Sequence, residues 1–195
     1  MTDRVRRWGP MLTAAGLFGV FVAPSPALAT MDILQTDDNS QTYCLTSGFT
    51  TQPSLAHNAM AVLDTTTEFA TPSAGTCSGA RASSTTDVWW IQMDLGTSIR
   101  GEEQCMRVIP GSTSPFLLPY CESADVRIDF AEIDNVGGAD DMQDREKTAV
   151  HELGHSVGLG HHTHVCAMRS GELGGTALTL RRWHASDITM INDNY

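Results

Sequence analysis

Basic residues are scarce in this chain: its 195 residues include 12 lysines and arginines against 23 aspartates and glutamates. Binding to nucleic-acid phosphates or to an anionic membrane needs a basic surface, so the charge balance argues against both partners. After residue 30 the sequence also lacks a transmembrane segment, an internal repeat and a long low-complexity tract. What remains is a globular domain, whose acidity we attribute to solubility rather than to a cationic partner.

The first 29 residues are typical of a secretory signal peptide. Three arginines in residues 4–7 make a basic start, residues 11–23 are apolar but too short to span a bilayer, and residues 27–29 form a small-residue cleavage site. An uncleaved anchor is the alternative. Removal leaves residues 30–195, one domain with nine basic and 22 acidic residues, a net charge of −13. We expect a secreted, extracellular protein, and the adjacent arginines leave general or twin-arginine export open.

Five cysteines follow the signal, as expected for a protein from an oxidising compartment. The number is odd, so one cysteine is left over, and two pairs can be drawn from five in 15 ways. The sequence does not choose among them, although a pair of Cys105 with Cys121 would link a hairpin-like stretch. We expect Cys166 to be unpaired.

Apolar periodicity predicts both strands and helices. Alternation predicts strands over residues 87–95, 105–109 and 125–133, with the two adjacent tryptophans of the first strand in the core. Helical spacing predicts an early helix within residues 55–69, a helix from residue 140 or 141 to 157, and a closing helix over 186–195. The stripe Val150, Leu153 and Val157 should face the core.

The strongest signal is the segment HELGHSVGLGHH, residues 151–162. His151 and His155 are four apart, so on a helix their imidazoles can point at one metal ion. Glu152 would lie beside that ion without binding it, as a base acting on a metal-bound water requires. Gly158 can take a positive φ that turns the chain and brings in His161 as third ligand. Three protein ligands and an open fourth position describe a catalytic zinc site.

Two alternatives to a catalytic zinc site are a helix with surface histidines and a structural zinc domain. HExxH arises by chance in about one such sequence in a hundred, so a helix with surface histidines must be weighed, but the extension to the third histidine is far rarer. His162 and His164 fit no ligand position at standard spacing, and we interpret them as rim residues. A structural zinc domain is the second alternative, with His164 or Cys166 as fourth ligand.

The segment HELGHSVGLGH matches the HExxHxxGxxH signature of the metzincin zinc peptidases, and Met168 looks like the Met-turn of that clan. Within the clan the chain resembles a small secreted bacterial matrixin-like peptidase, because DVRIDFAEI and SDITMINDNY are similar to the strand and the C-terminal helix of that group. The motifs that carry the resemblance lie in residues 125–195. Before residue 125 the likeness is architectural.

The resemblance implies an α+β zincin (metzincin) fold, with a mixed twisted sheet, an active-site helix and a C-terminal helix. It implies a zinc-dependent endopeptidase whose metal-activated water attacks peptide bonds. The implied site consists of the zinc ligands His151, His155 and His161, the general base Glu152, the turn residue Gly158 and the hydrophobic floor Met168. A binding module that keeps this fold without turnover is the alternative, although a silent site has no use for a base.

Several properties stay open. We expect a protein or peptide substrate and a monomer, but loop composition does not define the cleavage specificity. No cysteine-switch motif explains latency, and no tyrosine closely follows Met168. Calcium could bind the acidic residues within 134–144, but a solvated loop and helix cap is the interpretation we favour.

Overall fold

The computed structural model describes residues 35–78, 85–110, 119–136, 141–171 and 177–195, so the predicted signal peptide lies outside the described residues. Within them the chain forms a six-stranded, mostly parallel sheet and four α-helices, an α+β arrangement. The strands are β1 (Gln35–Thr36), β2 (Tyr43–Leu45), β3 (Ser73–Thr76), β4 (Val88–Gln92), β5 (Gly101–Ile109) and β6 (Tyr120–Ile128). The helices are α1 (Pro53–Thr66), α2 (Phe130–Val136), α3 (Asp141–Ser156) and α4 (Ala185–Asn194), with 3-10 turns η1 (Phe49–Thr51) and η3 (Leu178–Arg181).

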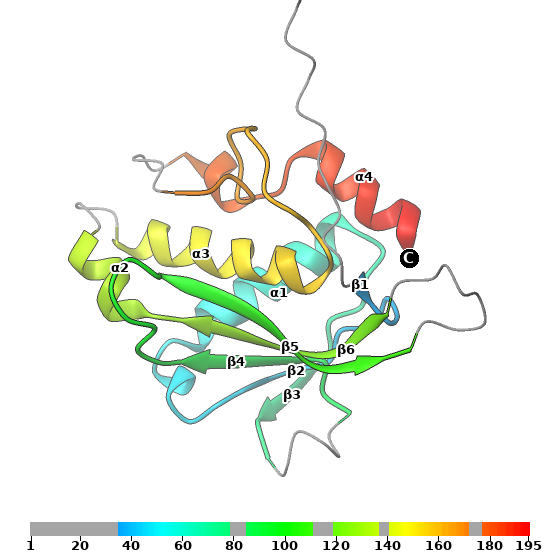
Figure 1. The fold of residues 1–195 in the computed structure, drawn as a ribbon, viewed down its shortest axis with the longest axis horizontal. Helices are drawn as coiled ribbons and strands as arrows, with labels where there is room; N and C mark the ends of the chain where they lie inside the picture. The colour runs from blue at the N-terminus through cyan, green and yellow to red at the C-terminus, as the bar shows by residue number, and fades with distance from the viewer. Residues whose placement is uncertain (1–34, 79–84, 111–118, 137–140, 172–176) are drawn as a thin grey trace, which may run out of the picture.

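Strand β6 is the centre of the sheet. It pairs in parallel with β1 and β4, and β4 continues through β2 to β3, while β5 pairs with β6 in the antiparallel sense. Among the described residues β6 is the one sheet neighbour of β5, which therefore forms an edge. Figure 1 shows α3 running along the sheet above this edge, and β5 and α3 are in contact. The edge strand thus lies beside the helix that carries the histidine motif.

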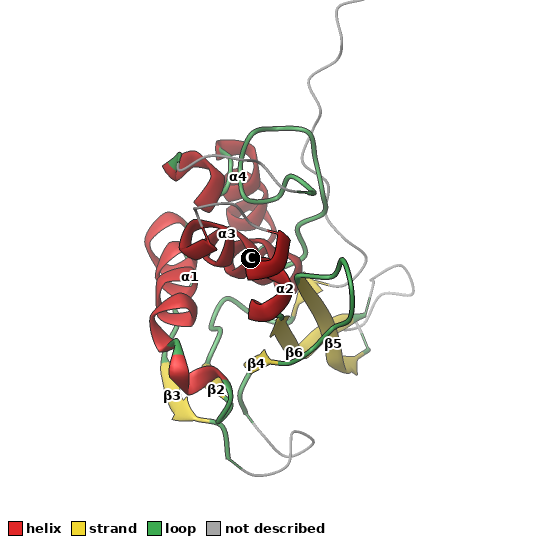
Figure 2. Ribbon diagram, turned by 90° about the vertical axis from the view of Figure 1, so that its left-hand side faces the viewer, coloured by secondary structure: helices red, strands yellow, loops and turns green. Residues whose placement is uncertain are grey.

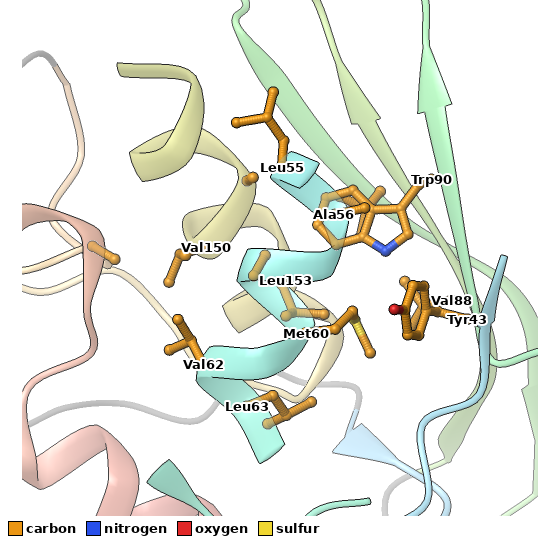
Figure 3. Close-up of a cluster of buried hydrophobic side chains, with 14 of the residues drawn as sticks. Tyr43, Leu55, Ala56, Met60, Val62, Leu63, Val88, Trp90, Val150 and Leu153 are labelled. Carbon is orange, nitrogen blue, oxygen red and sulfur yellow. The ribbon is translucent and has the colours of Figure 1, made fainter. Parts of the chain in front are cut away.

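Helices α1 and α3 bury their apolar faces against the same side of the sheet (Figure 2). Figure 3 shows Met60 of α1 and Leu153 of α3 in one cluster with Trp90 of β4. The stripe predicted for α3 is confirmed, since Val150, Leu153 and Val157 are all buried. Both adjacent tryptophans of β4 are buried as predicted. Burial of this stripe against the sheet fixes the rotation of α3 about its axis.

The predicted early, motif-bearing and closing helices correspond to α1, α3 and α4, and the strands predicted over 87–95 and 105–109 correspond to β4 and β5. The prediction of one strand over 125–133 is wrong beyond Ile128. There Asp129 caps α2: its Oδ1 accepts the N–H of Glu132 at 3.0 Å, and its carbonyl oxygen accepts the N–H of Ile133 at 3.1 Å. Ile133 is buried by helical spacing rather than by strand alternation.

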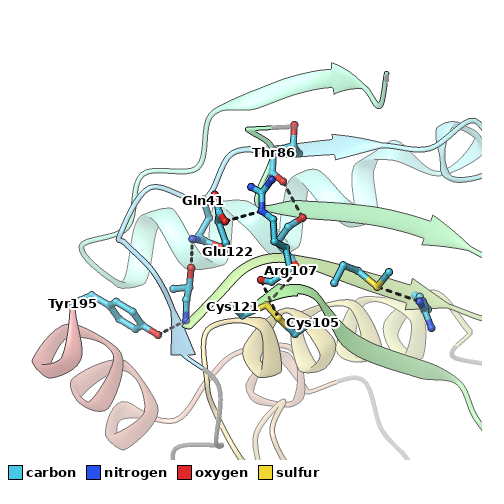
Figure 4. Close-up of a disulfide and its surroundings, with 11 residues drawn as sticks. Gln41, Thr86, Cys105, Arg107, Cys121, Glu122 and Tyr195 are labelled. Atoms are coloured by element: carbon cyan, nitrogen blue, oxygen red, sulfur yellow. Dashed lines mark hydrogen bonds and ion pairs between the residues drawn. A yellow bond between two sulfur atoms is a disulfide. The ribbon is translucent and has the colours of Figure 1, made fainter. Parts of the chain in front are cut away.

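Two disulfides link Cys44 with Cys77 and Cys105 with Cys121. The second joins β5 to β6 (Figure 4), and the remaining cysteine, Cys166, is free and buried, as the sequence predicted. The hydroxyl of Tyr195, labelled in Figure 4, accepts the N–H of Thr36 at 3.0 Å, and this bond ties Tyr195 to β1. Disulfides are typical of proteins from oxidising compartments. None of the described helices has the length and apolar character needed to cross a membrane.

Candidate metal centre

Three histidines of the motif converge on one point. His151 and His155 lie one turn apart on α3, and Gly158, with a φ of 85°, turns the chain after the helix so that His161 comes back toward them. The Nε2 atom of His161 is 2.9 Å from Nε2 of His151 and 3.0 Å from Nε2 of His155. The Nε2 atoms of His151 and His155 are 3.2 Å apart. The structure therefore brings together all three sequence-predicted ligands.

Backbone carbonyls fix the protonation of two of these rings. Nδ1 of His151 lies 2.7 Å from the carbonyl oxygen of Ala167, and Nδ1 of His155 lies 2.7 Å from that of Leu159. A carbonyl oxygen only accepts, so both Nδ1 atoms carry the proton and donate. Burial lowers the pKa of His151 to about 3, which keeps that ring neutral. Its Nε2 lone pair therefore points at the other two rings.

The inward-facing lone pairs of His151 and His155 repel each other unless a cation or a donated proton lies beside them, and the arrangement of the three rings fits a metal ion. Metal–nitrogen bonds of about 2.0–2.1 Å in a tetrahedral site place neighbouring nitrogens about 3.3–3.4 Å apart. The observed separations of 2.9, 3.0 and 3.2 Å are slightly shorter. Three imidazoles suit zinc and also copper, iron or nickel, so the donor set agrees with zinc without selecting it.

Glu152 lies next to this centre on α3 and is buried. Burial, followed by the charge of Glu103, raises the pKa of Glu152 to about 8. Its side chain packs against β5 at Gly101, where an added Cβ would lie 2.6 Å from Oε1 and 2.7 Å from Cγ of Glu152. Only a glycine at position 101 allows the strand to approach this closely. No sequence pattern singled out Gly101, because the contact forms between residues 51 positions apart.

A cleft of about 530 Å³ opens over Glu152. Its walls come from the segment that enters β5, from α3 and from the chain after Met168, and two of the candidate ligands, His151 and His161, line it. A second hollow of about 450 Å³ lies between α1, α3 and η3, but none of the three histidines lines it. The cleft beside β5 is therefore the place where a substrate could reach the centre.

Met168 is fully buried beneath α3 at Gly154, where an added Cβ would lie 2.3 Å from its sulfur. It belongs to a turn in which the N–H of Arg169 bonds to the carbonyl oxygen of Cys166 at 3.3 Å. The same turn supplies the carbonyl of Ala167 that holds His151. Met168 thus packs below the helix while its neighbour orients a candidate ligand, which is the position expected of a floor.

His162 is not a rim residue, contrary to the prediction. It is buried, and its Nε2 lies 2.9 Å from Oδ1 of Asp187 at the start of α4. The free Cys166 completes this cluster, with Sγ 3.5 Å from Nε2 of His162. Sequence reasoning missed Asp187 because it lies 25 residues beyond His162, and no local spacing connects them.

The second cluster differs from the histidine triad in its protonation. Nδ1 of His162 accepts the backbone N–H of His164 at 3.1 Å, so the ring proton is on Nε2, where it is donated to Asp187. A ligating Nε2 needs the opposite tautomer. His162, Cys166 and Asp187 therefore form a hydrogen-bonded link between the loop and α4. Cys166 belongs to this link, and His164 stacks on His184 with ring centroids 4.1 Å apart, so within the described chain neither joins the triad as a fourth ligand.

Part of the acidic stretch 134–144 is also described. Asp134 pairs with the guanidinium of Arg145 at 2.6 Å, and Asp141 begins α3, where a carboxylate suits the helix dipole. Among described residues, the groups with metal-ligand geometry include no carboxylate from this stretch. The structure thus gives these two acids an ion-pairing and a helix-end role.

No protein-family model matches the chain, and no curated protein sequence matches it. Its function is therefore inferred from the residues and the geometry of the site.

Proposed function

We propose that residues 30–195 form a secreted zinc-dependent endopeptidase of the metzincin type, similar to the matrixin-like members, with the zincin fold. One observation carries the proposal: three imidazoles with converging Nε2 atoms lie beside a buried glutamate that is not among them. A structural centre has no need of such a carboxylate, whereas a hydrolytic centre needs a base close to the metal.

The catalytic roles follow from the positions of the side chains. When bound, zinc supplies a Lewis acid that polarises the scissile carbonyl and lowers the pKa of a water molecule. Glu152 takes the proton of the attacking water and passes it to the leaving amine. Burial favours its protonated form, which suits the second of these transfers, and a nearby cation favours the carboxylate needed for the first.

The edge strand supports a peptide as substrate. β5 has one sheet neighbour among the described strands, and it passes Glu152 at Gly101. An extended peptide can add to such an edge through its backbone groups, which would hold a peptide bond beside the centre. The two disulfides and the signal-like residues 1–29 support secretion.

The decisive variant is Glu152→Ala. Because Glu152 is not a ligand, the variant should keep about one zinc per chain, measured by atomic emission on the purified protein, and lose cleavage of a peptide library. Glu68→Ala, an exposed glutamate elsewhere, is the matched control and should cleave as the parent does. A Glu152→Ala protein that cleaves as fast as the parent would overturn the mechanism.

The binding-module alternative predicts a different result for the parent itself. Zinc-loaded parent protein that cleaves no member of the library would favour it. Binding of a hydroxamate separates the peptidase and the binding module from a structural zinc domain. A closed site with four protein ligands has no open position, so a structural zinc domain should not bind the hydroxamate.

A further inference from the structure

The chain contains a single lysine, Lys147, and it lines the metal-centre cleft. Lys147 precedes His151 by four residues on α3, so the two side chains share a helix face, with Cβ atoms about 5–6 Å apart. Thr148 and Glu152 stand in the same relation one position further on. His151 lines the same cleft, so the lysine and this candidate ligand border one space.

Lys147 is 9% exposed and has no carboxylate partner among the described residues. Nζ donates to the carbonyl oxygens of Arg169 and Gly171, each at 3.1 Å. An ammonium group has three donors, so one remains for another acceptor. Lysine is almost never this buried without an ion-pair partner, because neutral carbonyls compensate only part of the lost hydration.

Charges of both signs lie around Lys147, and none of the described carboxylates forms an ion pair with it. Burial, followed by the charge of Arg100, lowers the pKa of Lys147, and the charges of Asp144 and Glu152 oppose this only in part. Arg100 lines the same cleft. Among the described lining residues Glu152 is the one carboxylate, and it is assigned to the proton transfers. Lys147 thus places a buried cation in the lining of this cleft, in a protein that is acidic as a whole.

We propose that Lys147 is a specificity-determining residue that binds the carboxylate of an aspartate or glutamate side chain close to the scissile bond. This inference rests on the proposed peptidase function. Lys147 and His151 line the same cleft, so a peptide bound beside His151 can present a neighbouring acidic side chain to Lys147. The carbonyls of Arg169 and Gly171 hold the ammonium in place for this contact, which is a charge-assisted hydrogen bond.

Cleavage of matched peptides tests the inference. The starting point is a peptide that the enzyme cleaves. At each of the two positions before and the two positions after the scissile bond, one peptide with glutamate is compared with one that has glutamine. At one position the glutamate peptide should have a kcat/KM about tenfold higher. Lys147→Met should abolish this preference and Lys147→Arg should keep most of it. Equal cleavage of all pairs by the parent, or an unchanged preference in Lys147→Met, would overturn the inference.

Lys147 could instead serve only to tether residues 169–171. In that case Lys147→Met lowers kcat/KM for the glutamate and glutamine peptides by the same factor, and the ratio between them stays as in the parent. Lys147→Glu extends the comparison, since a charge contact predicts that it reverses the preference toward a lysine-containing peptide, whereas a tether predicts no such reversal.

Binding without turnover separates this inference from the proposed function. A single lysine gives one ¹³Cε signal in protein labelled with ¹³C-lysine, so the signal needs no further assignment. In zinc-loaded Glu152→Ala, the glutamate peptide should shift it with saturation and the glutamine peptide should not. A glutamate-specific shift with no cleavage by the parent contradicts the peptidase function alone. Cleavage by the parent with neither a shift nor a preference contradicts the role of Lys147 alone.

Discussion

Nδ1 of His151 donates a hydrogen bond of 2.7 Å to the carbonyl oxygen of Ala167, the residue before Met168. This contact joins the first histidine of the motif to a turn 16 residues later, and it leaves Nε2 as the atom that faces the other two imidazoles. The turn therefore has two effects on the centre. Met168 supports the helix from below, and its neighbour sets the tautomer of a candidate ligand.

Removal of the third imidazole should weaken metal binding. His161→Ala leaves two of the three converging nitrogens, and we expect zinc affinity to fall by more than about 100-fold, since loss of an outer partner alone costs 10–100-fold. Competition with a chromogenic chelator measures the change. His164→Ala is the control, because this ring stacks on His184 and should leave affinity unchanged. Equal losses in both variants would contradict the assignment of ligands.

Gly101→Ala should impair catalysis without removing zinc. The new Cβ would lie 2.6 Å from Oε1 of Glu152 and 2.7 Å from Cγ2 of Thr148, so the carboxylate must move. A displacement near 1 Å costs about 100-fold in rate. Kinetics and zinc content on one preparation test this. Gly48→Ala, where the added Cβ would meet ordinary contacts at 3.6 Å, should behave as the parent does; equal activity of the two variants would contradict a role for the close approach.

The link between the loop and α4 should contribute to stability. Asp187 is fully buried and accepts from Nε2 of His162 and from the backbone N–H of His184 at 2.9 Å each. Asp187→Asn removes the charge from both bonds, and we expect the free energy of unfolding to fall by about 1–3 kcal/mol, measured by urea denaturation. Asp193→Asn, an exposed change on the same helix, should have almost no effect. An equal shift in both variants would argue against the link.

Asp87 should make stability depend on pH. Burial raises its pKa from 3.8 to about 7, and the N–H of Thr42, which donates to Oδ2 at 2.7 Å, opposes this only in part. Between these two pKa values the folded state holds a proton that the unfolded state has released. The contribution of Asp87 to the free energy of unfolding is therefore fully present below about pH 4 and is lost as the pH rises through 7. Unfolding at pH 5 and pH 8 should show a loss for the parent that is smaller in Asp87→Asn. An identical loss would exclude Asp87 as the source.

Apolar periodicity in the sequence predicted the orientation of a helix or strand correctly where that element buries a single face. The stripe Val150, Leu153 and Val157 predicted the orientation of α3, and this orientation places His151 and Glu152 in the lining of the cleft. The prediction from periodicity failed beyond Ile128, because apolar residues continue after the strand ends. The side chain of Asp129 caps a helix there, and the hydrophobic pattern does not reveal this. Local patterns thus specify elements better than their ends.

In the candidate site too, local contacts could be predicted from the sequence and contacts between distant residues could not. Residues 151–161 are close in sequence, so helix geometry and one glycine with positive φ suffice to predict that three histidines and a glutamate lie together. The burial of His162 could not be predicted, because its partner Asp187 arrives from α4. Lys147 belongs to the same helix as the motif, but its lack of a carboxylate partner is a property of the surrounding loops.

The sequence alone determined that two imidazoles and a carboxylate share a helix turn, because the repeat of the α-helix imposes it. It also determined that one of the five cysteines must lack a partner within the chain and that acidic residues outnumber basic ones. Tertiary structure decided the rest: which carbonyl orients His151, which strand packs on Glu152, and which cation faces the cleft. These contacts join residues far apart in the chain, and they form only when the sheet, α3 and α4 pack around a common core.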